Sequence, residues 1–177
     1  MEITISWEQR KLGDLIVKGG SGGTPSTGKL EYYTGNIPFL SITDISNSNG
    51  YIYKTEKHIT EEALNNSTAW IVPSESISLA MYASVGKVAI LKHNTATSQA
   101  FYNMVIPEIA TRDYVYHYLK KMEEFSEWDP LISTGTQANL NAEKVKNLLI
   151  NIPTKLDEQK IIGTSLNSLD YLITLHQ

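Results

Sequence analysis

The 177-residue sequence contains no cysteine. This absence excludes disulfide bonds, thiolate nucleophiles and zinc sites with cysteine ligands. No apolar run approaches the roughly 18 residues that a membrane span needs, and the first residues lack the basic and apolar segments of a signal peptide. The sequence therefore predicts a cytoplasmic protein with no membrane partner.

Charged residues are also scarce, and no strong excess of one sign is present. The sequence has 15 Lys and Arg residues against 19 Asp and Glu residues, a formal net charge of -4 at pH 7. Because strong non-specific binding to nucleic acid needs a basic face, electrostatics alone does not indicate a nucleic-acid-binding protein. The apolar content of 41% is that of an ordinary globular chain, and a chain of this length favours one domain.

The order of apolar residues predicts short strands followed by helices. Strands are expected at 37–45, 51–54, 70–72, 76–81, 86–91, 101–106 and 148–152, with a hairpin formed by 76–81 and 86–91. Helices are expected at 111–124, 141–147 and 156–176, the first of them capped by Thr111. Residues 7–17 predict a short helix or strand anchored on Trp7, Leu12, Leu15 and Ile16. Residues 133–139 predict a polar loop.

A glycine-dense loop is expected at residues 19–28, and it contains two near-matches to catalytic motifs. Gly19–Gly23 fits the G-x-S-x-G pattern of hydrolases, but turn residues follow it instead of the helix that this chemistry needs. Gly23–Leu30 has the spacing of a phosphate-binding P-loop, but Leu30 has no hydroxyl for magnesium. A nucleotide-binding enzyme that uses loop 19–29 is therefore an alternative reading only.

The last expected helix carries an apolar seam. Ile162, Leu166, Leu169 and Ile173 follow one another at intervals of 4, 3 and 4, the spacing of a coiled-coil seam. Such a seam packs either on the core of its own domain or on a helix from elsewhere. The terminal position of the helix, after the break at Pro153, favours the second interpretation.

Six segments, taken in their order, resemble a target recognition domain of a type I restriction-modification specificity subunit. These segments are 7–14 (WEQRKLGD), 22–27 (GGTPST), 35–45 (GNIPFLSITDI), 86–91 (GKVAIL) with 98–101 (SQAF), 134–140 (TGTQANL), and 152–153 (IP) with 156–161 (LDEQKI). The resemblance covers nearly the whole chain. It implies an α+β fold, with a compact β-rich recognition domain and flanking helices over 1–153 and the start of a conserved spacer helix over 154–177.

The resemblance also implies the function and the partners. Such a domain reads one half of a bipartite sequence in double-stranded DNA and docks modification (methyltransferase) subunits, and a restriction subunit joins the complex. The chain resembles half of a specificity subunit, either a natural half-length protein or a fragment, so its helix would pair with a second recognition domain or a second copy. No catalytic residue or metal is expected in this chain, because S-adenosylmethionine, ATP and Mg²⁺ would be bound by the partner subunits. A β-rich module that binds something other than DNA is a further alternative.

Polar and basic loop residues are the candidates for DNA contact. The candidates are Lys29, Lys54, Lys57, Tyr82, Lys87, Lys92, His93, Asn94, Gln99, Thr134, Thr136 and Gln137. Lys87 lies in a segment of the family pattern and is expected to be structural or to contact phosphate, which positions a protein without reading sequence. At least one of Lys92, His93, Asn94 and Gln99 is expected to contact a base edge. The seam residues Ile162, Leu166, Leu169 and Ile173 are the candidate partner interface.

Overall fold

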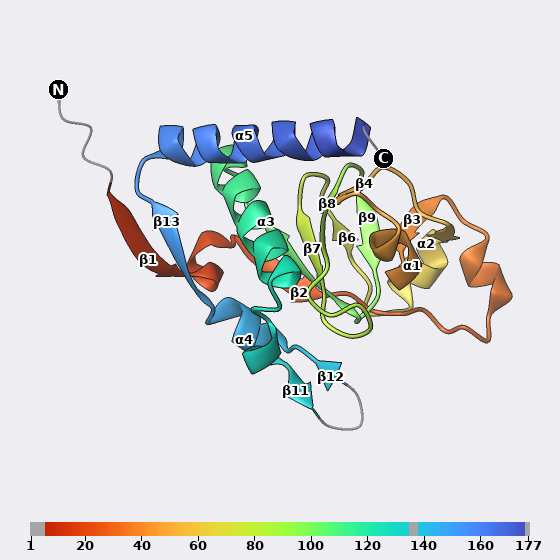
Figure 1. The fold of residues 1–177 in the computed structure, drawn as a ribbon. Coiled ribbons are helices and arrows are strands. Elements are labelled where there is room, and N and C mark those ends of the chain that lie inside the picture. Colours follow the sequence, from red (N-terminus) through yellow and green to blue (C-terminus); the bar gives the residue numbers. More distant parts are fainter. Residues whose placement is uncertain (1–5, 135–137, 176–177) are drawn as a thin grey trace.

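The computed structural model describes residues 6–134 and 138–175 and contains two small mixed sheets flanked by helices (Figure 1). The five-stranded sheet has the order β2 (Lys18–Ser21), β10 (Phe101–Val105), β7 (Ile77–Ala80), β8 (Val88–Leu91) and β4 (Tyr51–Ile52). The four-stranded sheet has the order β5 (Lys57–Ile59), β3 (Ile37–Leu40), β9 (Thr95–Thr97) and β6 (Ile71–Val72). The α+β fold class predicted from the sequence is confirmed.

The predicted hairpin is confirmed, with β7 antiparallel to β8 and Ile77 opposite Ile90. Both strands are buried along their whole length, so they lack the alternation typical of a half-exposed sheet. In the turn between them, Gly86 has a φ of 92°, and a Cβ built there would lie 2.6 Å from the ring of Trp128. Only glycine combines that backbone angle with that close approach.

A separate two-stranded sheet pairs the first described strand with the last. β1 (Trp7–Lys11) is antiparallel to β13 (Leu149–Pro153), with Trp7 opposite Pro153. The predicted helix or strand at 7–17 is thus a strand followed by a 3-10 helix, Leu12–Leu15. Of the residues expected to anchor it, Leu12 is fully buried, Leu15 and Ile16 pack on the core, and Trp7 is about half exposed.

Two long helices lie on the side of the five-stranded sheet opposite the four-stranded one. α3 (Ile109–Glu124) packs its apolar face on the core formed by β7, β8 and Trp128, and α5 (Leu156–Leu175) lies across α3 (Figure 1). Glu108, rather than Thr111, caps α3 by accepting a hydrogen bond from the amide of Ala110, so the predicted cap was wrong. Thr111 instead donates its hydroxyl to Gln159 of α5, at 2.7 Å.

Short elements account for the other differences from the sequence predictions. The end of the strand expected at 37–45 is a helix, α1 (Ile42–Ser46), because Ser41 and Asp44 form a capping box. The start of the expected loop at 19–28 belongs to strand β2. In the expected loop at 133–139, the two ends are the short strands β11 (Ser133–Thr134) and β12 (Ala138–Asn139), which pair antiparallel. Elements that the sequence did not predict are β5, β9, α2 (Glu61–Asn65) and the 3-10 helices Leu30–Tyr33 and Asp129–Leu131. The helix near 141–147 is α4 (Ala142–Lys146), capped by Asn141.

One buried side chain links the two sheets. Asn103 of β10 is fully buried, and its carboxamide oxygen accepts a hydrogen bond from the Ser78 hydroxyl of β7 at 2.7 Å. Its amide nitrogen donates to the Gly20 carbonyl of β2 at 3.1 Å and to the Thr97 hydroxyl of β9 at 2.8 Å. The carboxamide therefore joins three strands of one sheet, β10, β7 and β2, to strand β9 of the other.

None of the helices formed by residues 6–134 and 138–175 combines the length and the apolar composition needed to cross a membrane.

Replacing Gly86 by alanine should lower the free energy of unfolding by about 2–5 kcal/mol, because the positive φ and the contact with Trp128 both oppose a Cβ atom. Gly28→Ala is the matched control, since a Cβ there meets only the Ser26 hydroxyl at 3.9 Å, and its effect should stay below about 1 kcal/mol. Urea unfolding followed by tryptophan fluorescence measures both. Equal effects for the two variants would show that the turn tolerates a side chain.

Candidate nucleic-acid interface

The glycine-rich segment lies directly on the four-stranded sheet. A Cβ at Gly22 would lie 1.8 Å from the Thr97 carbonyl oxygen, and one at Gly23 would lie 2.1 Å from the Thr68 hydroxyl. The amide of Gly23 donates to the Thr97 carbonyl at 2.9 Å. Gly22 thus permits close packing on β9 and Gly23 on the segment at Thr68 that precedes β6, and the Gly23 amide is already bonded within the protein. This geometry differs from a P-loop, in which the backbone amides point at a phosphate.

Beyond Gly23 the segment is tied down at two further points. The hydroxyl of Tyr33 donates to the Pro25 carbonyl at 2.7 Å, and the hydroxyl of Thr24 donates to the carboxamide oxygen of Gln99 at 2.6 Å. The second bond orients the Gln99 amide nitrogen away from Thr24. A glutamine presented in this way can donate to an acceptor on a base edge.

Two hollows meet at His58. The larger, of about 550 Å³, is lined by Thr24, Lys57 and His58 among others. The smaller, of about 130 Å³, is lined by Lys54, His58 and His93 among others. We call the surface formed by Thr24, Lys54, Lys57, His58, His93 and Gln99 the recognition surface.

The recognition surface contains four of the predicted DNA-contact residues and two that the sequence did not single out, Thr24 and His58. His58 is not among the residues that the sequence predicted to contact DNA. It lies in β5, next to Lys57, and the pairing of β5 with β3 turns it toward both hollows. The only sequence signal was its position beside a lysine in a short polar stretch.

Lys87 and Lys92 lie away from this surface, on the side of α3. The ammonium of Lys87 lies 3.6 Å from a carboxylate oxygen of Glu123, and that of Lys92 lies 2.5 Å from Glu75. Glu75 is also bonded to the buried Arg112. Burial opposes the ionisation of Glu75, but hydrogen bonds and charge from Lys92 and Arg112 outweigh it and lower the pKa of this carboxyl.

The remaining candidates are dispersed. Lys29 donates to the Tyr32 hydroxyl at 2.9 Å, a hydrogen bond that raises the pKa of this lysine, and Asn94 accepts from the Ser74 amide at 2.9 Å. Tyr82 is exposed in the β7–β8 turn. The carbonyl of its neighbour Met81 accepts a hydrogen bond from the Leu140 amide. Thr134 lies in β11, and Thr136 and Gln137 lie outside the described residues.

α5 carries two different stripes. The face toward α3 consists of Gln159, Gly163, Asn167 and Asp170. The predicted seam lies beside that face: Leu169 is 54% and Ile173 is 58% exposed, whereas Ile162 and Leu166 line a groove of about 360 Å³ together with Trp7 and two tyrosines of α3. Most of the seam is therefore left uncovered by its own domain.

No three histidine or carboxylate side chains in the described part of the chain form a group that could hold a metal ion. The polar groups gathered at the recognition surface are hydrogen-bond donors and acceptors together with cationic groups. Such a set is suited to binding, because it can contact base edges and phosphates.

Comparison with known proteins agrees with the order of segments noted in the sequence. The family model described as "Type I restriction modification DNA specificity domain" matches residues 5–177. The chain is 35% identical over 174 residues to the type I restriction enzyme MjaIX specificity subunit of Methanocaldococcus jannaschii, covering 97% of this chain and 40% of the relative. It is 28% identical to the HindI specificity subunit of Haemophilus influenzae, covering 84% of this chain and 32% of the relative.

The fold matches solved structures as well. The crystal structure of a type I restriction-modification S subunit from M. genitalium superposes with a TM-score of 0.67 at 18% identity, over 97% of this chain and 41% of that chain. The chain thus spans about two-fifths of the length of the M. jannaschii relative and of this structure.

The ion pairs of Glu75 should make stability depend on pH. Because the pKa of Glu75 is lower in the folded state than its ordinary value of 4.5, its stabilising effect is present above that value and is lost as the pH falls through the folded pKa. The difference in unfolding free energy between wild type and Glu75→Gln should therefore be largest near pH 6 to 7 and shrink below about pH 4.5. Urea unfolding over this range measures it, with Glu62→Gln, an exposed change on α2, as the control. A difference that stays constant with pH would contradict the assignment.

Proposed function

Because the chain belongs to the family of type I restriction modification DNA specificity domains, we propose that it reads one half of a bipartite double-stranded DNA target for a type I restriction-modification enzyme. The observation that carries this proposal is the match of the family model to residues 5–177. The M. jannaschii relative, a specificity subunit, is covered over only 40% of its length. We propose that a second recognition domain, on the same polypeptide or on a second copy, reads the other half.

We assign base reading to the recognition surface. Gln99, held by Thr24, offers an amide donor, and Lys57 and His58 line the adjoining hollow. Lysine contacts to phosphate position a protein on the duplex, whereas amide contacts to base edges discriminate between sequences. Lys87 and Lys92 remain predicted DNA contacts, and each would have to exchange its carboxylate partner for DNA.

The net charge of -4 means that this chain alone provides little of the phosphate neutralisation that drives DNA binding. We propose that modification subunits supply most of it, together with S-adenosylmethionine and the methyl-transfer chemistry. A restriction subunit would bring ATP and Mg²⁺. The chain would then select the DNA sequence without catalysing a reaction itself, and it would act in the cytoplasm, where the target DNA lies.

Substitutions on the recognition surface should separate base reading from phosphate contact. In the assembled enzyme, Gln99→Ala should cost about 1–3 kcal/mol of discrimination at one base pair, whereas Lys57→Ala should weaken binding to all sequences and reduce the salt dependence. Lys155→Ala, an exposed lysine before α5, is the control. Fluorescence anisotropy with a panel of single-base variants of the duplex gives the affinities. Uniform losses for Gln99→Ala would place base reading elsewhere.

The seam should mediate pairing with another helix. Leu169 and Ile173 are more than half exposed, and burying each against a partner would contribute about 1.5–3 kcal/mol before entropy costs. Leu169→Asp and Ile173→Asp should therefore abolish assembly with the second recognition domain or copy. Tyr171→Asp is the matched control, because Tyr171 is 64% exposed on the other side of the helix. Sedimentation measures the mass, and equal behaviour of all three variants would exclude the seam as the interface.

A further inference from the structure

The face by which α5 attaches to its own domain is polar, although the helix has abundant apolar residues. This docking stripe consists of Gln159, Gly163, Asn167 and Asp170, at intervals of 4, 4 and 3, which places them on one side of a helix. Gln159 and Gly163 are buried. A Cβ at Gly163 would lie 2.9 Å from the Cβ of Asp113, so the two helices approach closely at this glycine.

Asn167 is the centre of the stripe. Its amide nitrogen donates to a carboxylate oxygen of Asp113 at 3.2 Å. Its carboxamide oxygen accepts from the Tyr51 hydroxyl at 2.9 Å and contacts Nε2 of His117 at 2.8 Å. One side chain of α5 is therefore bonded to two residues of α3 and to strand β4 of the five-stranded sheet.

The protonation states of the partners favour these bonds. Burial raises the pKa of Tyr51 to about 12, so its phenol keeps the proton that it donates. Burial lowers the pKa of His117, which favours the neutral ring, with Nε2 as the donor to Asn167. Asp113 accepts through its second oxygen, and its first oxygen is already held by Arg112.

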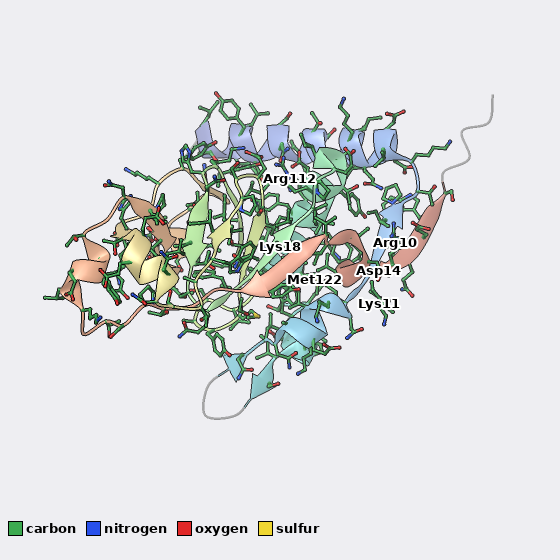
Figure 2. The ribbon with its side chains drawn as sticks, turned by 180° about the vertical axis from the view of Figure 1, so that it is seen from behind. Arg10, Lys11, Asp14, Lys18, Arg112 and Met122 are labelled. Carbon is green, nitrogen blue, oxygen red and sulfur yellow. The ribbon has the colours of Figure 1, made fainter. Side chains whose placement is uncertain are left out.

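A second layer of charged groups fixes Asp113 itself. Arg112 is 7% exposed and donates two hydrogen bonds to Asp113, at 2.8 and 2.6 Å. Arg112 is also bonded to Glu75, which precedes β7, and Figure 2 shows Arg112 directly beneath α5. The bonds thus run without interruption from α5 through α3 to the start of a core strand.

The ends of the docking stripe are bonded too. Gln159 donates to the Pro153 carbonyl at 2.7 Å and accepts from Thr111, and Asp170 accepts from Lys120 at 2.7 Å. An apolar face tolerates sliding, because its contacts have no direction, whereas buried hydrogen bonds are satisfied in one register only. A slip of one helical turn would move α5 by about 5.4 Å, which exceeds the roughly 3.4 Å rise of a DNA base pair.

We propose that Asn167, supported by Asp113 and Tyr51, is a positioning residue that fixes the register of α5 on the recognition domain, and thereby the distance between the two half-sites that the assembled enzyme recognises. This role rests on the proposed function. It differs from the seam, because the seam selects the partner helix, whereas the docking stripe determines where that helix begins relative to the DNA-reading surface.

Asn167→Leu in the enzyme assembled with an intact second recognition domain tests the proposal. The variant keeps the number and branching of side-chain heavy atoms but removes the three bonds. The second carboxylate oxygen of Asp113, the Tyr51 hydroxyl and Nε2 of His117 each lose this partner, while Arg112 still holds the first oxygen of Asp113. The readout is the methylation rate on a series of duplexes whose half-sites are separated by different numbers of base pairs. We expect about a tenfold loss of preference for the native spacing, with unchanged preference for the bases of this domain's half-site. Ser168→Leu, on the exposed side of the same helix turn, should leave the spacing profile unchanged.

A distance measurement tests the register without methylation. Because the chain has no cysteine, spin labels can be attached at Glu62→Cys on α2 and Tyr171→Cys on α5, both exposed. We expect one narrow distance distribution in the otherwise unchanged chain and a broadened or shifted one with Asn167→Leu. A folded Asn167→Leu chain that kept the narrow distribution would overturn the proposal.

The outcomes separate this proposal from the proposed function. An unchanged spacing profile with retained half-site preference would overturn the positioning role of Asn167 alone. A wild-type assembly that showed no preference for any half-site sequence would instead overturn the proposed function, together with the link between register and spacing.

Discussion

The arrangement of this domain depends on the buried carboxamide of Asn103. A buried amide is costly unless its donors and acceptor are satisfied, and here its oxygen and nitrogen bond to groups on β7, β2 and β9. These bonds hold the two sheets in one relative position. Because the glycine-rich segment lies on β9 and α3 packs against β7 and β8, the same amide relates the recognition surface on one side to the helices on the other.

Helix α5 has a polar face that contacts its own domain and an apolar face that is exposed. The docking stripe bonds the helix to its own domain through polar groups, and the seam presents apolar groups to the outside. Polar contacts give direction and register, whereas apolar contacts give affinity in proportion to the buried area. A helix that carries both on adjacent faces can be rigid with respect to its domain and still bind a partner.

The sequence predicted the larger elements because their signals are long or locally complete. The β7–β8 hairpin and helices α3 and α5 have enough apolar residues in a regular pattern to be recognised, whereas the short helix α4 has a local signal in its N-cap Asn141. The short strands β5 and β9, of three residues each, have no such pattern, and their position follows from pairing with β3, which is a tertiary contact. The helix α1 depends on a capping box, Ser41 with Asp44, inside what otherwise resembles a strand.

The candidate site was predictable in part for a related reason. Composition drew attention to Lys54, Lys57, His93 and Gln99, but only the fold brings them beside His58 and Thr24. Composition likewise could not show that Lys87 and Lys92 pair with carboxylates of distant segments. The docking stripe was missed because Gln, Gly, Asn and Asp on a helix look like a solvent-exposed face, whereas the seam was visible as an apolar repeat.

The pairing of β1 with β13 has a consequence for how such a domain can change. The chain enters the domain along one strand and leaves it along the neighbouring antiparallel strand, with Trp7 opposite Pro153. The segment between Lys11 and Leu149 therefore starts and finishes at paired positions of one two-stranded sheet. Surface loops generally tolerate changes in length and sequence. Loops between Lys11 and Leu149 can therefore be lengthened, shortened or exchanged without moving the position at which α5 begins. The exposed surface between Lys11 and Leu149 can in this way change its chemistry while the two strands that lead to α5 keep their dimensions.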